Sequence, residues 1–140
     1  NPFSLHIRKH MSTLENIDSI LADLESAIPR QIEGTVIASG DGFVITDTLR
    51  AEGEAEEVAA MVATTMGVST RMTDTLNAGE VQETSISGED RSIFLYRAGS
   101  EGVLAVVAKG DANVGMIHLQ AREAAKEIAG LLSAPSAASA

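Results

Sequence analysis

The sequence predicts an α+β domain in which three helices cover a five-stranded antiparallel sheet, as a three-layer α/β/α sandwich. Three observations lead to this fold class. Segments with helical spacing of apolar residues occur near the start, in the middle and at the end of the chain. Short β-prone runs and glycine-containing turns lie between them. One run, residues 103–108, is apolar throughout, which indicates a strand that is covered on both faces.

The first helix is predicted to begin at Ser12, because Glu15 follows three residues later in the spacing of a capping box. Apolar residues then recur on one face, and Pro29 ends the segment. This face consists of Leu14, Ile17, Ile20, Leu21, Leu24 and Ile28. A hairpin is predicted next over residues 35–46, because Asp41 and Gly42 tolerate the positive φ that its tight turn requires.

A long second helix is predicted over residues 54–76, with three glutamates at its start where the helix dipole favours negative charge. Three strands follow at residues 81–87, 92–96 and 103–108, and the polar residues of the first suit an edge strand. The last helix is predicted over residues 114–132. Its apolar stripe consists of Val114, Ile117, Ala121, Ala124, Ile128 and Leu131. The element order is therefore α-β-β-α-β-β-β-α, with the middle helix on one face of the sheet and the others opposite.

The organisation predicted along the chain is one domain at residues 11–132 with short flanking segments. Residues 1–10 are interpreted as a leader left by a cloning junction, because His10 directly precedes Met11 at the start of the first helix. Residues 133–140 contain mainly Ser and Ala, and we expect this tail to be frayed.

The composition excludes several classes of function. A net charge of −10 repels phosphate backbones and anionic lipids, so we expect neither a nucleic-acid partner nor a membrane partner. No apolar run approaches the ~18 residues that span a bilayer. Cysteine is absent, which excludes disulfides and thiolate nucleophiles and is compatible with the cytoplasmic location that we expect.

No arrangement of residues in the sequence indicates catalysis. His118 is the one histidine of the predicted domain, and we interpret it as a half-exposed helical residue. No histidine pair has metal-ligand spacing, and the glycines at 40 and 42 join two strands instead of opening a helix around a phosphate. We therefore expect no catalytic residue, no metal and no cofactor, and we predict that the chain is not an enzyme.

The middle helix carries more apolar surface than one sheet face can cover, because residues 58–70 include no charge. One stripe consists of Val58, Val62, Met66, Thr73 and Leu76, and a neighbouring stripe consists of Met61, Thr65, Val68 and Met72. Either the helix is deeply buried within a single subunit, or it mediates self-association. We favour self-association, in which the sheet edge at residues 81–87 pairs with its copy.

This order of elements resembles the Roadblock family of dynein light chains and prokaryotic GTPase regulators, including those of gliding motility. The similarity spans residues 14–132 and is clearest at 34–46 and 105–132. The resemblance implies a profilin-like fold of Roadblock type, a homodimer, and no catalytic centre. It also implies an adaptor that binds a Ras-like small GTPase and stimulates its GTP hydrolysis.

The resemblance places the dimer interface on the middle helix and the third strand, at Val58, Met61, Val62, Thr65, Met66, Ser69, Met72, Val81, Glu83 and Ser85. The GTPase contact is expected on the exposed flank of the same helix, at Glu56, Glu57, Ala60 and Thr64. Two alternatives stay open. One is a scaffold or transport adaptor without effect on hydrolysis. The other is a small-molecule sensor with a closed cavity lined by Phe43, Phe94 and Met116.

Overall fold

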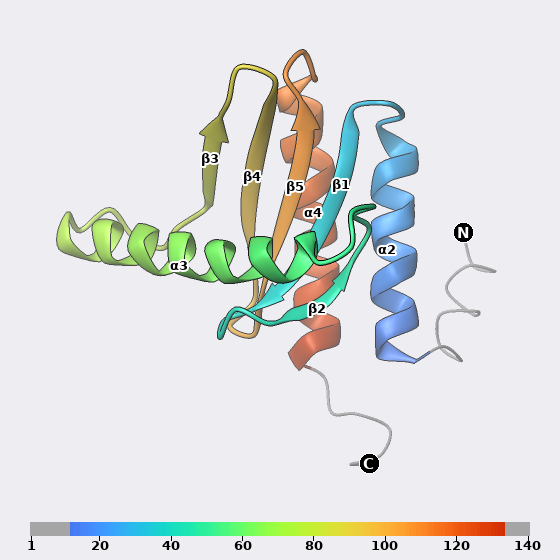
Figure 1. The fold of residues 1–140 in the computed structure, drawn as a ribbon. Coiled ribbons are helices and arrows are strands. Elements are labelled where there is room, and N and C mark those ends of the chain that lie inside the picture. The colour runs from blue at the N-terminus through green and yellow to red at the C-terminus, as the bar shows by residue number, and fades with distance from the viewer. Residues whose placement is uncertain (1–11, 134–140) are drawn as a thin grey trace.

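The computed structural model describes residues 12–133, and its elements follow the predicted order (Figure 1). They are α2 (Thr13–Ala27), β1 (Ile32–Ser39), β2 (Val44–Asp47), α3 (Glu54–Thr75), β3 (Glu83–Ser87), β4 (Arg91–Ala98), β5 (Gly102–Lys109) and α4 (Val114–Ser133). The predicted leader at residues 1–10 lies outside the described residues. So does the predicted tail apart from Ser133, which belongs to α4.

The five strands form one sheet in the order β2-β1-β5-β4-β3, and every neighbouring pair is antiparallel. The predicted turn joins β1 to β2: the Ser39 N–H donates to the Phe43 carbonyl at 2.8 Å, and Gly42 has a φ of 88°. As predicted, β3 lies at an edge of the sheet, so its outer backbone groups face away from the chain's own strands.

Two apolar cores cover the two faces of the sheet, which confirms the predicted three layers. The larger core joins α2 and α4 to one face, where Leu104 and Val106 of β5 are fully buried. The smaller core joins α3 to the other face, where Val103 and Ala105 are buried. The central strand β5 is thus covered on both sides, as its unbroken apolar run predicts.

The first helix begins as the capping box predicts, because the Glu15 N–H donates to Ser12 Oγ at 3.1 Å. Two residues assigned to apolar stripes are exceptions. Leu14 is 48% exposed and Val114 is 45% exposed, because each lies in the first turn of its helix, at the margin of the helix packing. Among residues 12–133, no helix has the length and apolar character needed to cross a bilayer.

Candidate interaction surface

The helix α3 crosses the sheet on the face opposite α2 and α4 (Figure 1). Only one stripe of it is buried. That stripe consists of Ala55, Ala59, Val62 and Met66, which pack in the smaller core. A second set of apolar side chains lies along one side of the helix and is exposed. We call it the apolar flank: Met61 (60% exposed), Val68 (50%), Met72 (59%) and Leu76 (72%), the last directly after the helix.

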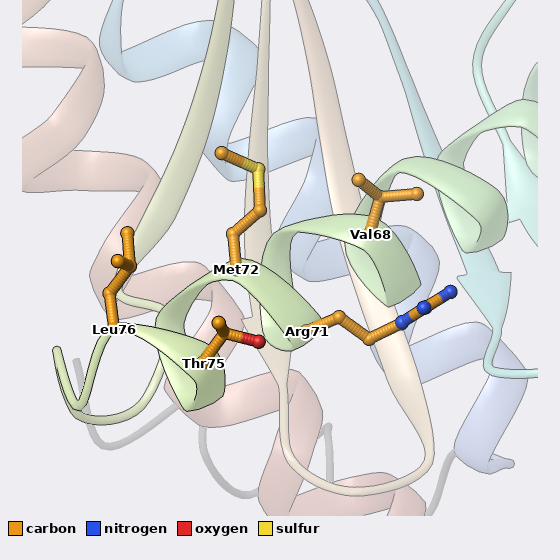
Figure 2. A pocket seen from close by; sticks show the side chains of 5 residues that line it. All are labelled: Val68, Arg71, Met72, Thr75 and Leu76. Atoms are coloured by element: carbon orange, nitrogen blue, oxygen red, sulfur yellow. The ribbon is translucent and has the colours of Figure 1, made fainter.

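Figure 2 shows the C-terminal part of the apolar flank, where Val68, Met72 and Leu76 project from successive turns. Together with Arg71 and Thr75 they line a hollow of about 500 Å³. Within residues 12–133, nothing covers this side of the helix, so the predicted excess of apolar surface is real. The alternative in which α3 is fully buried within one subunit is wrong.

The residues predicted for the dimer interface separate into three groups. Three of them are buried in the smaller core of the chain itself and are not available for contact with a partner: Val62, Met66 and Val81. Partly buried positions are Val58, Thr65, Ser69 and Glu83, and exposed ones are Met61, Met72 and Ser85. The sequence distinguishes two adjoining stripes on the helix. It does not show which of them the sheet covers, because both are apolar.

The C-terminal end of α3 extends past the edge of the sheet (Figure 1). The helix crosses the edge strand at Ser69, whose Oγ accepts a 3.0 Å hydrogen bond from Thr84 of β3. The next residue, Thr70, accepts a 2.8 Å bond from Arg97 of β4. The six helical residues from 70 to 75 span roughly 9 Å at 1.5 Å per residue, or about two strand spacings.

One row of the sheet beside α3 is incompletely covered. Ile86 of β3, Ile93 of β4 and Val107 of β5 are cross-strand partners on the face that α3 packs against. Ile86 is 45% exposed, and Ile93 and Val107 are partly buried. This row is a second apolar surface next to the sheet edge, and sequence analysis missed it because Ile86 lies in an otherwise polar strand.

The residues predicted for the GTPase contact, Glu56, Glu57, Ala60 and Thr64, are all exposed on α3. An aromatic side chain that sequence analysis assigned elsewhere lies near them. Phe43, in the β1–β2 turn, is 73% exposed. Its neighbour Gly42 packs so tightly on α3 that an added Cβ would lie 3.3 Å from the Cα of Ala60. The turn and the helix therefore form one surface with an acidic and an aromatic part.

The cavity expected for a small-molecule sensor does not form. Phe94 is 3% exposed in the larger core, whereas Phe43 and Met116 are 73% and 40% exposed. Side chains that point to solvent cannot enclose a ligand together with a core residue. Within residues 12–133, no group of three His, Asp or Glu side chains is placed to hold a metal ion.

A polar network that sequence analysis did not anticipate connects α4 with β3 and β4. His118 Nδ1 lies 2.7 Å from the Tyr96 hydroxyl, and the imidazole packs edge-on against Phe94 and Tyr96. Arg122 of α4 binds both carboxylate oxygens of Glu83 at 2.6 to 2.9 Å. These bonds hold the start of the edge strand against α4. The carboxylate of Glu83 is therefore bound within the chain itself.

Burial raises the pKa of the Tyr96 hydroxyl above its ordinary value, and the negative charge of Glu83 raises it further while Arg122 lowers it. Tyr96 therefore stays protonated at neutral pH and is able to donate its hydrogen bond to His118. This interaction explains His118 as a half-buried structural residue, in line with its interpretation from the sequence.

The comparisons with known proteins agree with the element order described above. The family model for the Roadblock/LC7 domain matches residues 21–108. The chain belongs to the Roadblock/LC7 family. A curated relative, the uncharacterized protein MJ1340 of Methanocaldococcus jannaschii, is 31% identical over 112 residues, which cover 80% of this chain and 96% of that protein.

Solved structures show the same fold. A Roadblock/LC7 domain from Streptomyces avermitilis has a TM-score of 0.78 at 20% identity, with 84% of this chain and 98% of that chain covered. The gliding protein MglB from Thermus thermophilus has a TM-score of 0.78 at 17% identity, with 87% and 92% covered. This Roadblock/LC7 chain therefore shares its architecture with a gliding-motility protein at low sequence identity.

Proposed function

We propose that the chain is a non-catalytic adaptor that forms a homodimer through the apolar flank of α3 and the edge strand β3, and that the dimer binds a Ras-like small GTPase and stimulates its GTP hydrolysis. The observation that carries the proposal is the apolar flank, because three large side chains are exposed along one side of the helix and a fourth directly after it. The structural likeness to MglB supports this class of regulator.

A dimer with its two-fold axis beside β3 would cover both exposed apolar surfaces at once, the apolar flank of α3 and the row of the sheet beside it. The part of α3 beyond the sheet edge, about two strand spacings long, matches the incompletely covered row that begins at Ile86 and Ile93. In a symmetric pair, each overhanging helix end lies on the partner's row, and the two apolar flanks pack against each other. The unpaired backbone of β3 then joins the two sheets.

The proposed GTPase contact is the surface formed by the start of α3 and the β1–β2 turn. Glu56 and Glu57 give it negative charge, which steers a partner with a basic surface and increases the association rate. Phe43 supplies an exposed aromatic side chain, a residue type that is enriched at protein interfaces relative to the rest of the surface. The dimer offers no reacting group in this proposal, and it stimulates hydrolysis by repositioning the GTPase's own residues.

The direct test is to mix the purified chain with Ras-like GTPases encoded in the same genome, and to measure complex formation by calorimetry and the rate of GTP turnover. We expect a complex and faster turnover. Binding with unchanged turnover would support the scaffold or transport adaptor and remove the regulator. Absence of binding to every such GTPase would overturn the partner assignment.

A pair of variants locates the contact. Thr64→Glu places a charge in the proposed GTPase surface, and Ala22→Glu adds the same charge to an exposed position of α2, beyond the other face of the sheet. We expect Thr64→Glu to weaken GTPase binding at least tenfold and Ala22→Glu to leave it unchanged. Equal effects of the two variants would show that the surface around Thr64 is not the contact.

A further inference from the structure

A recess of about 740 Å³ lies where the α2–β1 turn, the start of β4 and the end of β5 meet the segment before α3. It gathers basic side chains in an acidic protein. Of the ten Lys and Arg residues, Arg8 and Lys9 lie outside the described part of the chain, and four of the other eight line this recess. They are Arg30, Arg50, Arg91 and Lys109.

The acids of the recess neutralise these cations only in part. Arg91 forms an ion pair with Glu33, which fixes the guanidinium at the wall of the recess. Within residues 12–133, the side chains of Arg30, Arg50 and Lys109 have no hydrogen-bonded or ion-paired partner. The recess has one further acid, Glu54, so its lining carries two more positive than negative charges.

The backbone holds one of the cations in an unfavourable conformation. Arg30 has a φ of 67°, in the left-handed region that residues with a side chain rarely adopt. Glycine or asparagine would occupy this turn position with less strain. Sparsely populated conformations of this kind cluster at functional sites, and here the residue lines the recess.

Part of the recess lining is apolar. Val107 of β5 and Leu49 of the β2–α3 segment line it together with the basic side chains. Leu49 lies against β1 because Gly34 has no side chain: a Cβ there would lie 2.6 Å from Cδ2 of Leu49. A ligand in the recess would therefore meet an apolar surface and positive charge together, at a volume within the range of about 300–1,000 Å³ that is usual for small-molecule sites.

We propose that this recess binds a small phosphate monoester with an apolar or aromatic body. The phosphate, a dianion near neutral pH, matches the two uncompensated positive charges and is held by Arg50, Lys109 and Arg30. The body lies on Val107 and Leu49. The site includes Glu54 of α3 and Val107 of the incompletely covered row, but none of its basic residues belongs to the apolar flank or to the Phe43 turn, and its test needs no GTPase.

The test is calorimetric titration of the full chain with phenyl phosphate, inorganic phosphate and benzoate at low ionic strength. We expect saturable binding of one phenyl phosphate per chain. Inorganic phosphate lacks the apolar body and benzoate carries a single charge, so both are expected to bind at least fivefold more weakly. Benzoate binding as tight as that of phenyl phosphate, or no saturable binding of phenyl phosphate, would overturn the proposal.

Three variants distinguish the recess from general charge effects. Lys109→Gln is expected to weaken phenyl phosphate binding at least tenfold, whereas Lys126→Gln, which removes the same charge from an exposed site on α4, leaves it unchanged. Glu33→Gln removes the acid that pairs with Arg91 and is expected to strengthen binding about threefold. Equal weakening by Lys109→Gln and Lys126→Gln, or weaker binding by Glu33→Gln, would contradict the assignment.

Discussion

The substitution Met72→Glu separates the proposed dimer from the fold of the single chain. Met72 is 59% exposed on the overhanging end of α3, outside both apolar cores. Replacement of an exposed side chain outside the core usually changes the free energy of unfolding by no more than about 0.5 kcal/mol. The chain should therefore fold normally and lose only contacts to a partner.

The expected size of the effect follows from the surface that remains to be buried. Full burial of a methionine side chain contributes roughly 1.5–3 kcal/mol, and the exposed 59% of Met72 accounts for roughly 1–2 kcal/mol of it. A symmetric dimer contains the contact twice, so about 2–4 kcal/mol is lost. This loss raises the dimer dissociation constant about thirtyfold to several hundredfold, and burial of the glutamate charge raises it further.

Sedimentation equilibrium across a range of concentrations measures the dissociation constant of the wild-type chain and of Met72→Glu. The matched control is Ala22→Glu, which adds the same charge to an exposed position of α2, beyond the other face of the sheet, and should leave the dimer intact. An unchanged dissociation constant for Met72→Glu, or equal weakening by Ala22→Glu, would refute the assignment of the apolar flank to the dimer.

Three further predictions address the core, the partner contact and the buried tyrosine. Leu104→Ala removes a fully buried side chain from the larger core and should lower the free energy of unfolding by about 2–5 kcal/mol, measured by urea denaturation. Phe43→Ala should weaken GTPase binding at least tenfold in calorimetry, with an unchanged urea midpoint. Because burial raises the pKa of Tyr96, the stability that this residue contributes is complete below pH ~10, the pKa of an unfolded tyrosine, and decreases at higher pH. Stability measured from pH 9 to 11 should decrease less steeply for Tyr96→Phe.

Helical spacing and turn chemistry were sufficient to predict the fold. The long helix at residues 54–76 corresponds to α3 within one residue, and the edge position of β3 follows from its polar pattern. The spacing alone does not determine which apolar stripe of α3 the sheet covers. The structure buries Met66 and exposes Met72, so a glutamate at Met66 would disrupt the chain's own core and would not test the dimer.

Features assembled from distant segments could not be predicted from the sequence. Phenylalanine is usually buried, and no local pattern in the sequence shows that the β1–β2 turn leaves Phe43 exposed. His118 meets Tyr96, 22 positions away, because α4 packs on the strand that carries the tyrosine. The basic recess combines residues from four separate segments, and no local pattern marks Arg30 and Lys109 as neighbours.

We propose that a second copy of the chain covers the apolar flank of α3. Multi-angle light scattering of the purified protein at micromolar concentration shows whether this dimer forms in solution. We expect a single species of twice the 14.6 kDa chain mass. A species of 14.6 kDa over the whole concentration range would contradict it.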